Sequence, residues 1–133
     1  MRKFKRIILI DDQETTNFYN EYLLSEAKIA ENISVCNTTQ EAIELLENLD
    51  KTNSELKNVL VFLDVNLPGY TGFEFIEMNQ SLFQKTKEKG LRLFILSSSS
   101  STFDIKKARS CPIVDDMLEK PLTPESIQDI LNV

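Results

Sequence analysis

The sequence predicts an α/β protein with a five-stranded, mostly parallel sheet and helices on both of its faces. Short apolar runs alternate along the chain with segments whose apolar residues recur at helical spacing. Such alternation is typical of parallel strands joined by right-handed helical crossovers. The chain has 133 residues, the usual size of one domain, and we expect residues 1–133 to form one domain without a second one.

Five apolar runs predict the strands. Four are rich in Ile, Val, Leu and Phe, as strands buried on both faces usually are, and they cover residues 7–10, 59–63, 91–96 and 113–118. A weaker run covers residues 33–36. The runs are well spaced, which leaves room for a helix after each of them.

Apolar stripes in the intervening segments predict the helices. The clearest stripe follows Thr38 or Thr39 as N-cap and consists of Ala42, Leu45, Leu46 and Leu49. We expect similar stripes from Phe18, Tyr22, Leu23 and Ala27, from Phe75, Ile76, Gln80 and Phe83 after Gly72, and from Ile127, Ile130 and Leu131 after the N-cap Thr123. Residues 101–110 have only a thin apolar side, formed by Phe103, Ile105 and Ala108.

Charge and hydropathy exclude several classes of protein. Lys and Arg number 15 against 21 Asp and Glu, which gives a net charge of −6 and argues against a nucleic-acid binder. No apolar stretch approaches the length of a membrane span, and the run at residues 7–10 is too short for a signal peptide. We therefore expect a cytoplasmic protein that does not insert into a membrane.

The chain contains no histidine, which excludes Ser-His-Asp and Cys-His catalysis and histidine-ligated zinc. If histidine chemistry matters to this protein, the histidine belongs to a partner. Cys36 and Cys111 are too few for a disulfide framework. We expect two small buried side chains in a reducing compartment.

Polar residues follow four of the five apolar runs: Asp11-Asp12, Asp64, Ser97-Ser98 and Lys120-Pro121. Ligands of open α/β sheets bind beyond the carboxyl ends of the strands. With the strand order 2-1-3-4-5, the three aspartates converge, and three carboxylates in one small site need a cation or large pKa shifts. Hard oxygen ligands without His or Cys favour Mg²⁺.

Mg²⁺, a lysine and a hydroxyl at one edge suit a phosphoryl group, and a carboxylate can be the nucleophile that accepts it. Each residue taken alone has a simpler interpretation. Asp12 or Asp64 could be an N-cap, residues 97–101 a polar loop, and Lys120 a solvated charge. The joint occurrence at four strand ends is harder to explain by capping.

Four motifs of the chain resemble the response-regulator receiver domain of two-component signalling, in its single-domain chemotaxis type. They are Ile-Ile-Leu-Ile-Asp-Asp at residues 7–12, Asp-x-x-x-Pro-x-x-x-Gly at residues 64–72, Leu-Phe-Ile-Leu-Ser at residues 93–97 and Glu-Lys-Pro-Leu at residues 119–122. The resemblance implies a flavodoxin-like, doubly wound fold and one receiver domain over the whole chain, with no output domain.

The resemblance also implies a role for each strand-end residue. Asp64 is the expected phosphoacceptor. Asp11, Asp12 and Asp64 would hold Mg²⁺, Asp12 more directly than Asp11, and the backbone carbonyl of Asn66 would be a further ligand.

Four further expectations concern Lys120, the peptide bond after it, the hydroxyl of Ser97 and the side chain of Met117. Lys120 would pair with the phosphoryl oxygens, and the Lys120–Pro121 peptide bond would be cis. Ser97 would be the switch hydroxyl. Receivers commonly carry an aromatic residue three positions before the lysine, where this chain has Met117, so we expect Met117 to contribute packing alone.

A phosphohistidine on a sensor histidine kinase or a phosphotransfer protein would be the phosphoryl donor, which fits the absence of histidine here. The protein would then be a signalling module that catalyses only its own phosphotransfer and dephosphorylation. One alternative is a scaffold that works without phosphorylation. Another is an Mg²⁺-dependent phosphatase, but such enzymes typically have a carboxylate where this chain has Asn66, and they need a cap over the substrate.

Overall fold

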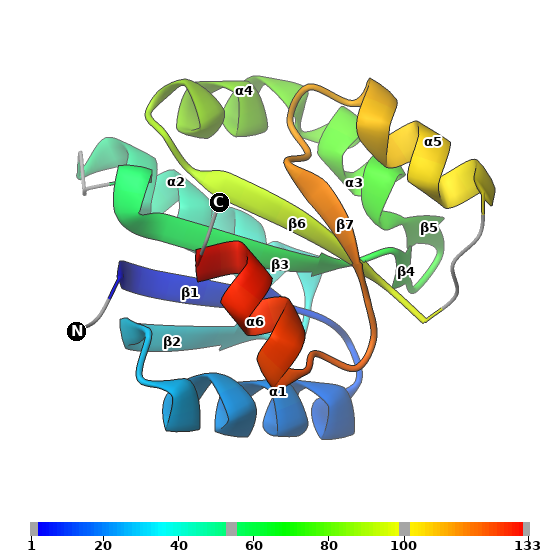
Figure 1. The fold of residues 1–133 in the computed structure, drawn as a ribbon. Helices are drawn as coiled ribbons and strands as arrows, with labels where there is room; N and C mark the ends of the chain where they lie inside the picture. The colour runs from blue at the N-terminus through cyan, green and yellow to red at the C-terminus, as the bar shows by residue number, and fades with distance from the viewer. Residues whose placement is uncertain (1–2, 53–55, 99–101, 132–133) are drawn as a thin grey trace.

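The structure is a computed structural model that describes residues 3–52, 56–98 and 102–131. Five parallel strands form one sheet (Figure 1). In spatial order they are β2 (Ala30–Cys36), β1 (Phe4–Ile10), β3 (Val59–Asp64), β6 (Arg92–Ser97) and β7 (Asp116–Glu119). This is the order 2-1-3-4-5 of the principal strands, so the predicted fold class is confirmed.

Helices cover both faces of the sheet, as predicted. α1 (Glu14–Ala27) and α6 (Pro124–Leu131) lie on one face, and α2 (Thr39–Lys51), α3 (Gly72–Met78), α4 (Gln80–Glu88) and α5 (Thr102–Ser110) lie on the other (Figure 1). A short 3-10 helix, η1 (Leu56–Asn58), precedes β3. Among the helices that the structure describes, none combines the length and the apolarity needed to cross a bilayer.

The central strand β3 separates two hydrophobic cores. All of its residues are buried. Because side chains alternate along a strand, Val61 and Leu63 pack in the core beneath α2 to α5, whereas Leu60 and Phe62 pack in the core beneath α1 and α6. This double burial explains the unbroken apolar run in the sequence.

Two predicted N-caps are confirmed. Thr38 Oγ1 accepts a hydrogen bond from Glu41 N at 3.1 Å, and Thr123 Oγ1 accepts one from Ser126 N at 3.1 Å. These bonds satisfy amide groups that have no partner within the first turn of a helix. α2 and α6 therefore begin where the sequence predicts.

The predicted buried stripe of α1 is wrong. Phe18 and Tyr22 are 73% and 59% exposed, and Ala27 is exposed too, while Leu23 is only partly buried. The helix instead buries Asn17, Asn20 and Leu24. Hydrogen bonds from Asn17 to Asp11 and Asn37, at the ends of β1 and β2, stabilise the orientation in which this side of α1 faces the sheet. The spacing of apolar residues cannot indicate such bonds.

Other elements also differ from the prediction. β1 and β2 begin three residues before the predicted positions 7 and 33. The third helix is divided at Asn79, whose Nδ2 donates to Phe75 O at 3.0 Å, and Gln80 is exposed. A small antiparallel hairpin of β4 (Asn66–Leu67) and β5 (Tyr70–Thr71) precedes α3. The last strand begins at Asp116 rather than at residue 113, because residues 112 and 113 form a turn in which the Val114 N–H donates to Cys111 O at 3.1 Å.

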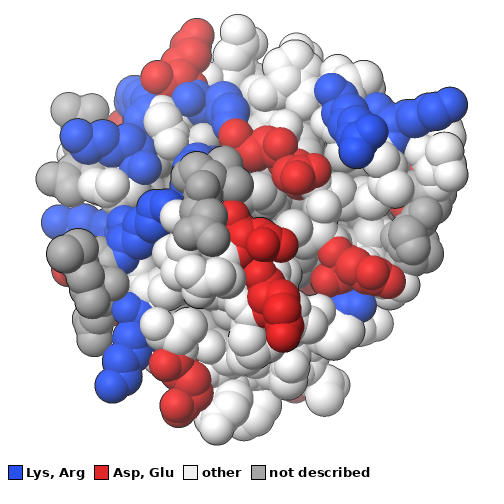
Figure 2. All heavy atoms as spheres, in the orientation of Figure 1, with Lys and Arg blue, Asp and Glu red and all other residues white. Residues whose placement is uncertain are grey.

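The surface charge follows the acidic composition. On the face drawn in Figure 2, acidic side chains gather over the middle, and basic side chains lie nearer the left and upper edges. The face in this view includes α6, which lies at the front of Figure 1.

Gly72 allows α3 to begin directly against the end of β3. A Cβ atom at this position would lie 2.6 Å from the backbone oxygen of Asp64. Gly72 N donates to Val65 O at 2.7 Å, and Thr71 and Glu74 form a capping box around the same turn. The close approach fixes the backbone that carries Asp64.

We predict that Gly72→Ala lowers the free energy of unfolding by about 1–3 kcal/mol, because the added methyl group must displace backbone atoms. Urea denaturation measures this change. Glu77→Ala, at an exposed position of the same helix, is the control and should change it by less than about 0.5 kcal/mol. Since Ala favours helices over Gly, an unchanged or higher stability of Gly72→Ala would contradict the close contact.

Candidate phosphoryl and metal site

The carboxyl ends of three parallel strands meet at one edge of the sheet. Asp11 follows β1 directly, Asp64 is the last residue of β3, and Lys120 follows β7. β1 and β3 are neighbours in register, with Ile10 opposite Leu63. Three residues that the sequence singled out separately therefore lie at one site.

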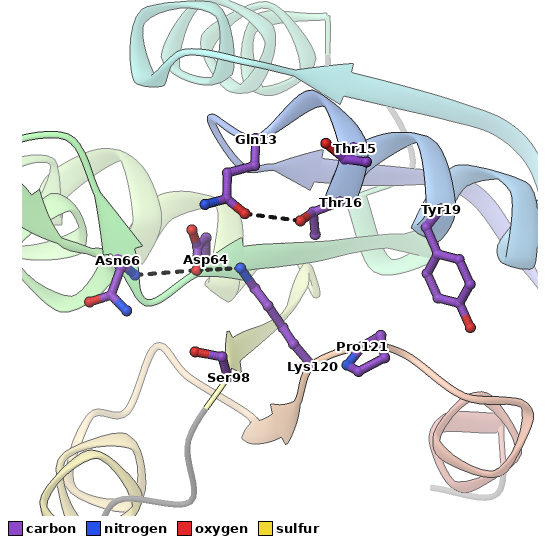
Figure 3. A pocket seen from close by; sticks show the side chains of 9 residues that line it. All are labelled: Gln13, Thr15, Thr16, Tyr19, Asp64, Asn66, Ser98, Lys120 and Pro121. Atoms are coloured by element: carbon purple, nitrogen blue, oxygen red, sulfur yellow. Dashed lines mark hydrogen bonds and ion pairs between the residues drawn. The ribbon is translucent and has the colours of Figure 1, made fainter.

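Lys120 joins the two buried carboxylates. Its Nζ lies 3.0 Å from Asp11 Oδ2 and 2.8 Å from Asp64 Oδ1. Both carboxylate side chains are 5% exposed, and that of Lys120 is 14% exposed. Figure 3 shows the Lys120 side chain reaching across the site to Asp64. Ion pairs this well buried are screened little by solvent.

The three aspartates form one acidic cluster. Each of Asp11, Asp12 and Asp64 offers a carboxylate oxygen, and these oxygens lie within 4.8 Å of one another. Asp11 and Asp64 are buried, whereas Asp12 is exposed. Within the described residues, the Asp12 carboxylate makes no hydrogen bond or ion pair, so its oxygens are free to bind a ligand.

The protonation equilibria reflect this crowding. Burial raises the pKa of Asp64, and the nearby Asp11 carboxylate raises it further, while the hydrogen bonds from Lys120 and Asn66 N lower it only in part. Burial by itself lowers the pKa of Lys120, but hydrogen bonds to Asp64 and Asp11 outweigh it and raise the pKa above its usual value. The ammonium form of Lys120 is therefore favoured.

The donor set fits a divalent cation of the Mg²⁺ type. Three carboxylates face one ammonium group, which leaves two negative charges uncompensated when all are ionised. The donors are all hard oxygens, as Mg²⁺ prefers. Asn66, the proposed carbonyl ligand, lies at the start of β4, and its N–H donates to Asp64 Oδ1 at 3.3 Å, which holds its backbone beside the acidic cluster.

A cavity of about 470 Å³ opens onto Asp64. Besides Asp64, Asn66 and Lys120, it is lined by Gln13, Thr15, Thr16, Tyr19, Ser98 and Pro121 (Figure 3). Gln13 directly precedes α1, and Thr15, Thr16 and Tyr19 lie in its first two turns. Sequence reasoning missed these four residues. Their position just after the first strand was the available signal, because a helix that follows a strand begins at the same edge of the sheet.

The two serines at the end of β6, Ser97 and Ser98, lie in different environments. Ser97, the predicted switch hydroxyl, is 1% exposed at the end of β6, and its backbone O accepts the Lys120 N–H at 2.7 Å. Ser98 is exposed and lines the cavity. Met117 is partly buried and packs against the core under α2 to α5. The rest of the serine-rich segment, residues 99–101, lies outside the described residues.

The Lys120–Pro121 peptide bond is cis, as the resemblance predicts. Pro121 lies at the edge of the cavity beside Lys120 (Figure 3). The backbone between Lys120 and Pro121 therefore has the predicted cis conformation.

Solved structures of related folds match almost the full length of the chain. A two-component response regulator from Cytophaga hutchinsonii is 30% identical with a TM-score of 0.87, covering 98% of this chain and 96% of that chain. The receiver domain of an Arabidopsis thaliana histidine kinase, complexed with Mg²⁺ and BeF3⁻, is 17% identical with a TM-score of 0.71, covering 97% and 91%.

A third match comes from a co-crystal structure of a Saccharomyces cerevisiae histidine phosphotransfer protein and the receiver domain of its downstream response regulator. It is 18% identical with a TM-score of 0.74, covering 99% of this chain and 89% of that chain. The two more distant matches show the fold alone. A comparison with curated proteins finds no match.

The family model of the response regulator receiver domain matches residues 7–132. The match includes every strand-end residue discussed above, from Asp11 to Lys120. Because it extends over nearly the entire chain, and the similar structures have the same fold, the chain belongs to the response regulator receiver domain family of two-component signalling.

Proposed function

We propose that the protein accepts a phosphoryl group on Asp64 in an Mg²⁺-dependent reaction, changes conformation, and loses the group by hydrolysis. The observation that carries the proposal is the position of Asp64. Its carboxylate lines an open cavity, lies in the acidic cluster, and contacts Lys120 at 2.8 Å. We expect residues 1–133 to act as a single receiver domain in the cytoplasm.

The transfer step exchanges one bond to phosphorus for another. An Asp64 carboxylate oxygen attacks the phosphorus, a P–O bond forms, and the bond from phosphorus to the donor's imidazole nitrogen breaks. The imidazole leaves with its electron pair and takes a proton from solvent. To end the signal, water attacks the same phosphorus and the bond from phosphorus to Asp64 breaks. This step releases inorganic phosphate and restores the Asp64 carboxylate.

The proposed metal ligands are the carboxylates of Asp11, Asp12 and Asp64 and the backbone carbonyl of Asn66. When bound, Mg²⁺ supplies positive charge that offsets the repulsion between the phosphoryl oxygens and the attacking carboxylate. The exposure of Asp12 supports a direct contact, since its carboxylate has no competing partner among the described residues. Asp11 is also held by Lys120, which supports a less direct role.

We propose that Lys120 changes its ion-pair partner when Asp64 is phosphorylated. Before transfer it neutralises part of the charge on Asp64 and Asp11. Once Asp64 carries the phosphoryl group as an acyl phosphate, the ammonium group turns to a terminal phosphoryl oxygen, which bears more negative charge than the bridging oxygen between carbon and phosphorus. Its raised pKa keeps it protonated for this role.

The donor is proposed to be a phosphohistidine of a sensor histidine kinase or phosphotransfer protein. The chain has no histidine of its own, so the donor imidazole must come from a partner. A yeast receiver with the same fold forms a complex with a histidine phosphotransfer protein, which supports a partner of this kind. The open cavity at Asp64 gives the donor access to the carboxylate.

We predict that Asp64→Asn gains no phosphoryl mass when it is incubated with acetyl phosphate and Mg²⁺, because an amide is not a nucleophile for this transfer. Intact-mass spectrometry measures the gain. The wild-type protein and Asp116→Asn, which changes an exposed carboxylate of β7, should each gain one phosphoryl group. A normal gain in Asp64→Asn would place the acceptor elsewhere.

We also predict that Ser97→Ala allows phosphorylation but reduces the amide shift changes that phosphorylation causes in residues 98–110. The Ser97 hydroxyl is proposed to donate to a phosphoryl oxygen and to draw the following loop inward. Two-dimensional NMR of both states measures this. Met117→Leu conserves volume and should keep the shift changes. The reverse order of the two variants would make Met117 the coupling residue.

A further inference from the structure

We propose that Asn17 is a positioning residue that fixes Asp11, and with it the acidic cluster, for Mg²⁺ binding. This inference rests on the proposed function of the site. Asn17 lies on α1 outside the receiver motifs, and it is 3% exposed. Its amide joins the ends of two strands, which is the geometry that carries the inference.

The Asn17 amide nitrogen makes two hydrogen bonds. Nδ2 donates to the backbone O of Asp11 at 2.8 Å and to Asn37 Oδ1 at 3.0 Å. Asp11 follows β1, and Asn37 follows β2. Both hydrogen atoms of one amide group are therefore used to connect the first turns of α1 with two neighbouring strand ends.

With the bond from Asn17, the backbone N–H, the backbone carbonyl and the carboxylate of Asp11 all form hydrogen bonds. Its N–H donates to Cys36 O at 3.2 Å. Its carboxylate accepts from Gln13 N through Oδ1 at 2.9 Å and from Lys120 Nζ through Oδ2 at 3.0 Å. Without Asn17, the Asp11 carbonyl loses its side-chain hydrogen bond, and the peptide plane between Asp11 and Asp12 is less restrained. A rotation of that plane would displace Asp12 relative to the Asp11 carboxylate, which Gln13 N and Lys120 still hold.

Burial of apolar surface does not account for an asparagine here. Asn17 Oδ1 is buried without a hydrogen-bond partner among the described residues, which costs free energy that an apolar side chain would not. Phe18, the next residue along the chain, is exposed. α1 therefore turns an amide inward and an aromatic ring outward, which is unfavourable for burial and favourable for holding Asp11.

Asn20 provides a matched control. It lies three residues further along the same buried face of α1, it is 2% exposed, and its Oδ1 also lacks a partner among the described residues. No hydrogen bond connects it to Asp11 within the described chain. Asn20→Ala therefore reproduces the loss of a buried asparagine without touching the site.

Isothermal titration calorimetry with Mg²⁺ tests the proposal on wild-type protein, Asn17→Ala, Asn37→Ala and Asn20→Ala, each well below its thermal midpoint. Asn17→Ala should raise the dissociation constant about tenfold, as loss of an outer-shell partner does. Asn37→Ala, which keeps the bond to Asp11, should raise it less, and Asn20→Ala should not change it. In the Mg²⁺-free protein, the NMR signal of the Gln13 amide should shift in Asn17→Ala and not in Asn20→Ala.

Equal dissociation constants for Asn17→Ala and Asn20→Ala, or an unchanged Gln13 signal, would overturn the positioning role while leaving the proposed function intact. If Asn17→Ala does not fold, Asn17→Leu decides, because it removes both donated hydrogen bonds and keeps the branched shape of the side chain, and a dissociation constant equal to that of Asn20→Ala would overturn the role. A wild-type protein without any Mg²⁺ binding would instead overturn the proposed function, and the Gln13 signal would still test the restraint of Asp11.

Discussion

The ion pairs of Lys120 with Asp11 and Asp64 are the interactions on which the arrangement of the site depends. Two carboxylates buried at neighbouring strand ends repel each other and lose hydration. The ammonium group lies within 3.0 Å of both carboxylates. Lys120 follows β7, the edge strand of the sheet, and is separated from Asp11 by 109 positions in the sequence. One lysine thus connects three strand ends. Removing it would leave two buried like charges without a cation.

This compensation is incomplete, and the incompleteness gives the site its chemistry. One ammonium group faces three carboxylates whose oxygens lie within 4.8 Å of one another. Burial raises the pKa of Asp64, and the neighbouring Asp11 carboxylate raises it further. In the proposed function, a bound divalent cation would offset the repulsion among the carboxylates, and the Lys120 ammonium group would then be available to an incoming phosphoryl oxygen. The cavity beside Asp64 is large enough for such a group.

The sequence predicted the fold class and the residues of the acidic cluster for a clear reason. Strands buried on both faces leave continuous apolar runs, and the first polar residues after them lie at the sheet edge where ligands bind. Asp11, Asp64 and Lys120 each occupy such a position.

Features that depend on hydrogen bonds in three dimensions could not be predicted in this way. Phe18 and Tyr22 suggested the buried face of α1, because apolar side chains are normally buried, but the bonds of Asn17 to Asp11 and Asn37 turn the helix the other way. β7 begins later than predicted for a similar reason. The Val114 N–H closes a turn to Cys111 O, and the apolar run through residues 113 and 114 does not indicate that turn.

The central claim is that the acidic cluster is an Mg²⁺ site, and calorimetric titration of wild-type protein and Asp12→Ala with Mg²⁺ tests it most directly. Asp12 is exposed and makes no hydrogen bond or ion pair in the described part of the chain, so its removal should leave the fold intact. The account predicts one Mg²⁺ site in the wild type and a dissociation constant at least about tenfold higher in Asp12→Ala, with Asp116→Ala unchanged. Equal binding by wild type and Asp12→Ala would contradict it.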